Sequence, residues 1–139
     1  MERLHDLASL LVACWTIATD NAKIPTSHGI LDRALRDAFD QGAFPTWARK
    51  IMHFADSRIG LQCVELPSIL KWAQIQELTT APNPSYEFTE IRVSERVAKQ
   101  LLKRLDVAEE DALSWGRLIN EAIANNRRSA CENPAYIEA

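Results

Sequence analysis

Residues 88–93, Phe-Thr-Glu-Ile-Arg-Val, constrain the fold of this chain more than any other stretch. Apolar and polar residues alternate along it, which is the pattern of a β-strand. The residues that follow have apolar positions three and four apart, which is typical of helices, so no second strand adjoins the first. Because the main chain of a strand needs hydrogen-bonding partners, we expect this strand to pair with another strand of the fold or with the same strand of a second copy.

The rest of the chain has mostly helical spacing. We expect a mainly α fold, with five to six helices in one compact, bundle-like domain and one short strand near residues 87–93. Helices are predicted at about residues 2–20, 29–40, 45–60, 67–78, 94–105 and 111–128. Residues 61–64 form a short apolar link that could be extended.

Particular residues suit the ends of these helices. Thr26 or Ser27 can cap the second helix, and Asp111 or Ser114 can cap the last one, because their side-chain oxygens accept bonds from free main-chain N–H groups. The first helix is expected to have an apolar face, whose residues recur at spacings of three and four: Leu4, Leu7, Leu11, Cys14 and Ala18. Leu10 and Trp15 widen that face.

Residues 79–85, Thr-Thr-Ala-Pro-Asn-Pro-Ser, form the clearest break in the pattern. Two prolines within this segment favour an extended path. We place a subdomain boundary there, between a helical part at residues 1–78 and a strand-helix-helix part at residues 86–128. Residues 129–139 are expected to be a loose tail.

Composition limits the class of protein. The chain has 139 residues, of which 47% are hydrophobic, enough for one domain with a buried core. A net charge of −3 gives no general attraction to nucleic acid. No segment is apolar for long enough to span a membrane, and the N-terminus lacks a basic leader, so we expect a cytoplasmic protein with no membrane contact.

Residues suited to catalysis or metal binding are sparse. The histidines at positions 5, 28 and 53 are far apart, and the three cysteines are scattered, so neither a metal site nor a disulfide framework is predicted. His53 and Asp56 would share one face of the third predicted helix, but a surface histidine near an acid is the preferred interpretation. We expect no enzyme activity and no cofactor.

Basic side chains gather near the predicted strand. Arg96, Lys99 and Lys103 share one face of the helix at residues 94–105. This stripe suits contact with a nucleic-acid backbone, although the same pattern also arises on a solvated face balanced by nearby acids. The candidate nucleic-acid contacts are Arg92, Arg96, Lys99, Lys103 and Arg117.

Two of the four tryptophans are candidate anchors for a protein interface. Trp15 and Trp47 fit apolar helical faces, whereas Trp72 and Trp115 fit them less well. Tryptophan is enriched among the residues that dominate binding energy at protein interfaces. If any tryptophan is exposed for recognition, we expect it to be Trp72 or Trp115; the alternative is that all four belong to the core.

Residues 88–128 resemble the ribbon-helix-helix family of DNA-binding dimers. The resemblance is carried by residues 89–97, Leu101 and residues 118–123, with Ser94 at the strand-helix junction. It implies that strands from two subunits pair in the major groove, with Phe88, Glu90 and Arg92 towards DNA. It also implies that Ser114 and the start of the second helix grip a phosphate, although the acids at residues 109–111 crowd that end.

The expected function is that of a non-catalytic helical interaction protein in a nucleic-acid context. It would be a dimeric DNA-binding regulator, or a small subunit of a nucleoprotein assembly such as a CRISPR effector complex. The alternative is a protein-binding adaptor, an immunity protein or a phage-encoded inhibitor without nucleic-acid contact. A protein partner or a homodimer is expected in either case.

Overall fold

The computed structural model describes residues 3–26, 29–58 and 60–132, with side chains described as far as Asn126. Its helices are α1 (Leu4–Ala18), α2 (Ile30–Asp40), α3 (Thr46–Ile51), α4 (Leu66–Ile75), α5 (Glu95–Arg104) and α6 (Glu109–Glu132). Its strands are β1 (Lys23–Pro25), β2 (Phe54–Ser57), β3 (Gly60–Cys63) and β4 (Phe88–Glu90). The prediction of a mainly α fold is confirmed.

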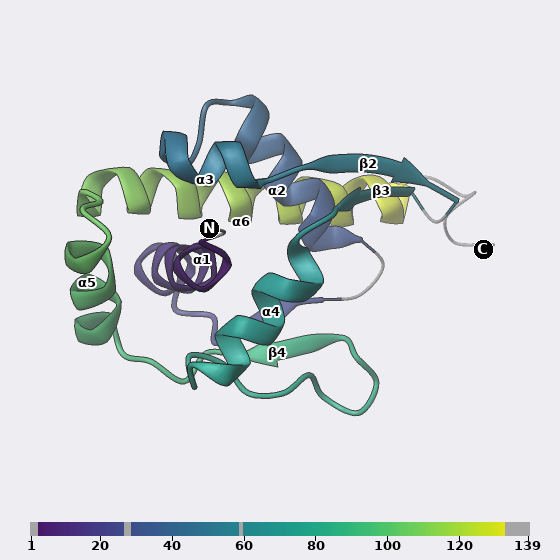
Figure 1. Cartoon of the computed structure of the whole chain (residues 1–139). Coiled ribbons are helices and arrows are strands. Elements are labelled where there is room, and N and C mark those ends of the chain that lie inside the picture. The colour runs from purple at the N-terminus through teal and green to yellow at the C-terminus, as the bar shows by residue number, and fades with distance from the viewer. Residues whose placement is uncertain (1–2, 27–28, 59, 133–139) are drawn as a thin grey trace.

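Helix α1 lies at the centre of the fold. It packs against α4, α5 and α6, which surround it in Figure 1. Every residue from Leu7 to Trp15 is buried, as is typical of a helix enclosed on all sides. The predicted apolar face is thus part of a wider buried surface that extends around the whole helix between Leu7 and Trp15. The indole nitrogen of Trp15 is satisfied inside the core, where it donates to the main-chain oxygen of Asn21 at 2.7 Å.

Helix α6 crosses α1 closely at Gly116. Figure 1 shows α1 end-on and α6 lengthwise, so these two helices cross steeply and do not run alongside each other as in a bundle. A Cβ atom added at Gly116 would lie 2.5 Å from the Cβ atom of Ala18 and would also collide with the main-chain oxygen of Cys14. Only glycine allows this approach, because any larger residue would push the two helices apart.

The partner of the predicted strand is a strand of the same chain. Strand β4 pairs antiparallel with β1, with Lys23 opposite Glu90 and Ile24 opposite Thr89. No strand was predicted around Pro25, between the first two helices. Pro25 is compatible with β1 because β1 is an edge strand, where one main-chain N–H is not needed for pairing.

The other edge of β4 is also occupied, by the segment that follows α4. The main-chain N–H of Thr80 donates to Glu90 at 2.8 Å, and that of Asn83 donates to Phe88 at 3.0 Å. Residues 79–85 therefore run beside β4, and one core contains buried residues from both predicted parts of the chain. Pairing of β4 between subunits, as the ribbon-helix-helix resemblance implies, would require one set of these bonds to break.

The third predicted helix is too long. Helix α3 ends at Ile51, and residues 54–63 form the antiparallel hairpin β2–β3. Two carboxylates from elsewhere hold the hairpin: Glu65 accepts from the main-chain N–H of His53 at 2.6 Å, and Asp32 accepts from that of Cys63 at 2.8 Å. The described residues thus contain four strands in two sheets where one strand was expected, and residues 61–64 are extended as anticipated up to Cys63.

The predicted cap of the second helix is also wrong at Thr26. Helix α2 begins after Gly29, which lies in the left-handed region at φ 67° and supplies no side-chain cap. The hydroxyl of Thr26 instead donates to the main-chain oxygen of Tyr86 at 3.1 Å, beside the β1–β4 sheet. Ser27, the other predicted cap, lies outside the described residues.

The last helix is longer than predicted at both ends. It begins at Glu109, so Asp111 and Ser114 lie within its first two turns and do not cap it. Acidic residues in a first turn favour the helix because they face the positive end of its dipole. Helix α6 also continues to Glu132, into the predicted tail, of which residues 133–139 lie outside the described part.

Candidate interaction surfaces

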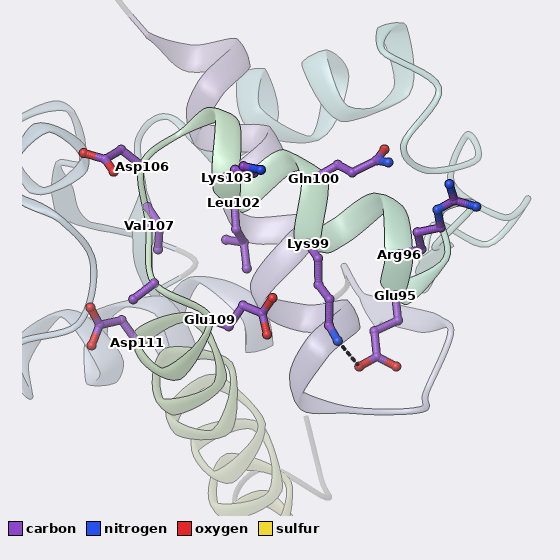
Figure 2. Close-up of a pocket in the computed structure, with 11 residues that line it drawn as sticks. Glu95, Arg96, Lys99, Gln100, Leu102, Lys103, Asp106, Val107, Glu109 and Asp111 are labelled. Carbon is purple, nitrogen blue, oxygen red and sulfur yellow. Dashed lines mark ion pairs between the residues drawn. The ribbon is translucent and has the colours of Figure 1, made fainter.

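The predicted basic stripe is located on α5. Ser94 caps this helix by accepting from the main-chain N–H of Val97 at 3.3 Å. The face towards α1 carries buried Ala98, Leu101 and Leu102, and the opposite face is polar. Three basic residues, Arg96, Lys99 and Lys103, are exposed and line a hollow of about 980 Å³ beside the start of α6 (Figure 2).

Acidic side chains line the same hollow. They come from the start of α5, from the turn after it and from the first turn of α6: Glu95, Asp106, Glu109 and Asp111. The hollow therefore has four carboxylates against three basic groups. The basic stripe is not an open electropositive surface, because a nucleic-acid phosphate there would also meet these carboxylates.

The other two predicted nucleic-acid contacts lie apart from this hollow. Arg92 is exposed just after β4, where its main-chain N–H donates to Leu78 at 2.9 Å. Arg117 is exposed on α6 beyond the first turn, and neither side chain lines the hollow. The structure thus brings together three of the five predicted basic residues.

The two candidate tryptophans differ in exposure. Trp115 is half-buried against the core, with its ring centroid 6.1 Å from that of buried Phe44. Of the two candidates, Trp115 is therefore the less accessible. Trp72 on α4 remains exposed over 38% of its surface. Its ring lies beside the imidazole of His5, with centroids 5.9 Å apart.

Trp72 belongs to an exposed apolar stripe along α4. Ile75 is 58% exposed, and Val64, just before the helix, is 56% exposed. Positions 68, 71, 72 and 75 lie by helical spacing on the side of α4 away from the buried Leu66, Ile69 and Ala73. We call Val64, Lys71, Trp72 and Ile75 the α4 face. Val64 and Ile75 were not predicted as contact residues. The available signal was that Ile75 is apolar but does not share the side of the helix that carries Ile69 and Ala73.

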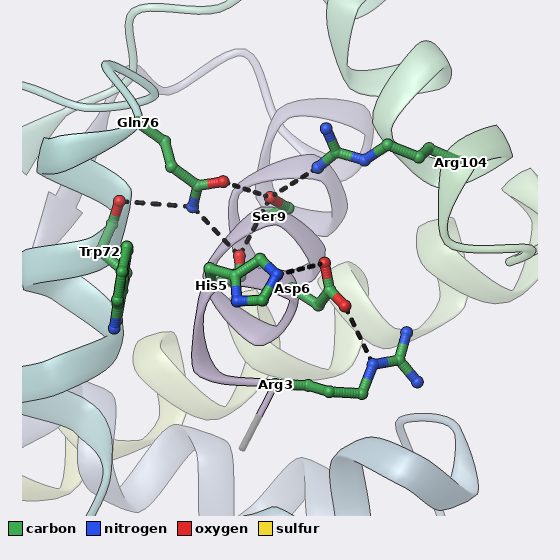
Figure 3. Close-up of polar contacts among 7 residues, drawn as sticks. All are labelled: Arg3, His5, Asp6, Ser9, Trp72, Gln76 and Arg104. Atoms are coloured by element: carbon green, nitrogen blue, oxygen red, sulfur yellow. Dashed lines mark hydrogen bonds and ion pairs between the residues drawn. The ribbon is translucent and has the colours of Figure 1, made fainter. Parts of the chain in front are cut away.

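A polar network fixes the C-terminal end of α4 against α1 and α5 (Figure 3). Gln76 donates through Nε2 to the main-chain oxygens of His5 at 3.1 Å and Trp72 at 3.3 Å. Ser9, fully buried on α1, donates to the same oxygen of His5 at 3.1 Å and accepts from Arg104 at 3.3 Å. These bonds hold the main chain at the end of α4 against α1, and they leave Ser9 enclosed, without the access a nucleophile needs.

His53 is located at the base of the β2–β3 hairpin and not on a helix. Its Nδ1 lies 2.9 Å from a carboxylate oxygen of Glu65, and the bond and charge of that carboxylate raise the pKa of His53 above 6.5. Asp56 is further along β2, so the predicted shared helical face does not exist. The contact of His53 with Glu65 fastens the hairpin to the start of α4.

The buried cysteines are chemically inert. Burial raises the pKa of Cys14 and of Cys63 to about 12, so both thiols stay protonated near neutral pH. Among the residues that the structure describes, no cluster of His, Cys, Asp or Glu is arranged to hold a metal ion. Nor is any helix in this part of the chain long and apolar enough to cross a membrane.

Comparison of the chain with protein-family models, with curated proteins and with solved structures gave no match. The functional argument therefore depends on the two surfaces described above, the α4 face and the hollow between α5 and α6.

Proposed function

We propose that this chain is a non-catalytic interaction protein that binds a protein partner through its α4 face. The observation that carries this proposal is the exposure of Trp72 and Ile75 side by side on a helix whose other side is buried. Adjacent exposed apolar side chains with polar surroundings are typical of protein-protein contact sites. Tryptophan in particular gives a large share of the binding energy at such sites.

The charge of the α4 face indicates the chemistry of its partner. Lys71 is the only charged residue within α4, and it lies directly beside Trp72. The imidazole of His5 lies next to the same ring. A partner segment with apolar side chains flanked by carboxylates would cover Trp72 and Ile75 and pair with Lys71.

The rigidity of this region supports binding. The hydrogen bonds of Gln76 to His5 and Trp72 fix the end of α4 before any partner arrives. A surface that is already ordered loses little conformational entropy on association, so more of the contact energy appears as affinity. The expected nucleic-acid role has weaker support, because carboxylates surround the basic stripe on α5.

Affinity capture with matched variants tests the proposal. A protein captured by the wild type should be lost with Trp72→Ala and weakened by Lys71→Glu. It should be retained by Tyr86→Ala, which removes an aromatic side chain that is 71% exposed elsewhere. The purified partner should then bind with at least about a tenfold loss of affinity for Trp72→Ala, as expected for an interface anchor.

Two results would reject a protein-binding α4 face. One is capture that is unchanged by Trp72→Ala and Lys71→Glu. The other is salt-sensitive binding of labelled duplex DNA or RNA at physiological salt that is lost with Lys99→Glu/Lys103→Glu. The second result would support a nucleic-acid role instead.

A further inference from the structure

We propose that the hollow between α5 and α6 is a self-complementary interface at which two copies of this chain pair about a two-fold axis. This surface is separate from the α4 face, and the inference does not depend on the proposed function. The argument uses the arrangement of charge in the hollow, the absence of internal pairing across it and the symmetry of dimers.

The charges in the hollow are separated into two walls. Helix α5 supplies the mainly basic wall, which carries Arg96, Lys99 and Lys103 together with one carboxylate, Glu95. The turn after α5 and the first turn of α6 supply the acidic wall, which consists of Asp106, Glu109 and Asp111. Figure 2 shows the basic residues and Glu95 along α5, and the other acidic residues beyond the end of α5 and on α6.

The two walls do not neutralise each other within one chain. Among the described residues, the ion pair that forms in the hollow joins Lys99 to Glu95 on the same helix, at 3.6 Å. The side chains of Arg96 and Lys103 and of the whole acidic wall have no ion pair in the described part of the chain. Both walls therefore keep charges available for a partner.

A second copy has the required complementarity. In a two-fold dimer the same patch meets itself in reversed direction, so each contact occurs twice. A patch of one sign would repel its copy, whereas a patch with a basic wall and an acidic wall places each wall against its opposite. The floor is apolar. Its Leu102 is already fully buried within one chain, so half-buried Val107 is the part that a second copy would cover, and its burial adds to the stability of the pair.

The dimer should be salt-sensitive and of modest affinity. Exposed ion pairs are individually weak and are screened by salt, so several of them together give an association that weakens as ionic strength rises. Sedimentation velocity over a range of protein concentrations, at low and at high salt, measures this directly. We expect a monomer-dimer equilibrium whose dissociation constant rises at least about tenfold at high salt.

Complementary charge reversal provides the decisive test. Lys99→Glu/Lys103→Glu and Glu109→Lys/Asp111→Lys should each be monomeric, because each places like charges against like in a symmetric dimer. Mixed in equal amounts, the two variants should recover a dimer that contains one chain of each. Arg92→Glu/Arg117→Glu, a double reversal that changes the charge as much as Lys99→Glu/Lys103→Glu but at exposed positions outside the hollow, should dimerise as the wild type does.

Reversal at the start of α6 also opposes the helix dipole, so a milder variant accompanies it. Glu109→Gln/Asp111→Asn should remain folded by circular dichroism and should weaken the dimer at least about fivefold, since both carboxylates lose their partners. A wild type that stays monomeric at all concentrations at low salt would overturn the proposal. So would a dimer that survives both charge reversals or that Trp72→Ala abolishes.

Discussion

Replacement of Gly116 by alanine tests the close crossing of α1 and α6. The added Cβ would lie 2.5 Å from the Cβ of Ala18, whereas packed carbon atoms are about 3.5–4.0 Å apart. The helices would have to separate by about 1 Å or more to restore an ordinary contact. The second obstacle is the main-chain oxygen of Cys14, which cannot rotate away as a flexible side chain would.

Two opposing effects set the magnitude. Overpacking of a filled interior costs about 1–3 kcal/mol, and a collision with backbone belongs at the upper end of that range. Alanine is favoured over glycine inside a helix by about 1 kcal/mol, which acts in the opposite direction. We therefore expect Gly116→Ala to lower the free energy of unfolding by about 2 kcal/mol.

Urea unfolding followed by circular dichroism measures this change. For a slope of roughly 1.5–2 kcal/mol/M, the midpoint should fall by about 1 M. Ala124→Gly, at an exposed position of α6, is the matched control and should cost about 1 kcal/mol through helix propensity alone. If Gly116→Ala leaves the protein as stable as before or stabilises it, propensity dominates and the close crossing is wrong.

Two further predictions concern titratable groups. Glu65 raises the folded-state pKa of His53 above 6.5, so the contact stabilises the fold fully below pH 6.5 and loses its effect as the pH rises through the raised pKa. An NMR titration of His53 should show a midpoint above 6.5 that falls in Glu65→Gln. A midpoint that Glu65→Gln leaves unchanged would show that the contact with Glu65 does not stabilise protonated His53. Burial raises the pKa of Cys14 and Cys63 to about 12. In Cys131→Ser, where these are the remaining thiols, a thiol reagent should therefore label the protein only when it unfolds. Rapid labelling of the folded protein would contradict the burial of the two cysteines.

Helix α5 shows how far local sequence reached. A helix was predicted at residues 94–105, and the structure has α5 there. The signals for it lie within one short segment: Ser94, which caps the helix, and the apolar residues Val97, Leu101 and Leu105. Helix α4 likewise has Pro67 in its first turn as expected. Such signals succeed because the interactions that start a helix join residues only three or four positions apart.

The candidate sites could be predicted in part for the same reason. Helical spacing alone placed Arg96, Lys99 and Lys103 on one face. It could not show that Asp106 and Glu109 turn back to line the same hollow, because the angle between α5 and α6 depends on how both pack around α1. The local pattern could not predict that Trp72 is exposed and that Trp115 is half-buried against Phe44 either. Phe44 lies about seventy positions before Trp115 in the chain, so no short segment contains both.

The sequence by itself therefore determined a mainly helical chain with a strand near residue 88, because helix periodicity, capping and strand alternation are local properties. Tertiary structure alone decided that this strand pairs with β1, more than sixty positions away, and that residues after Met52 leave the helix for a hairpin. Glu65 and Asp32 bind that hairpin's main chain, and the core buries α1 on every side. These outcomes depend on which distant segments complete each other's hydrogen bonds and apolar surface, and no short window of sequence contains both partners.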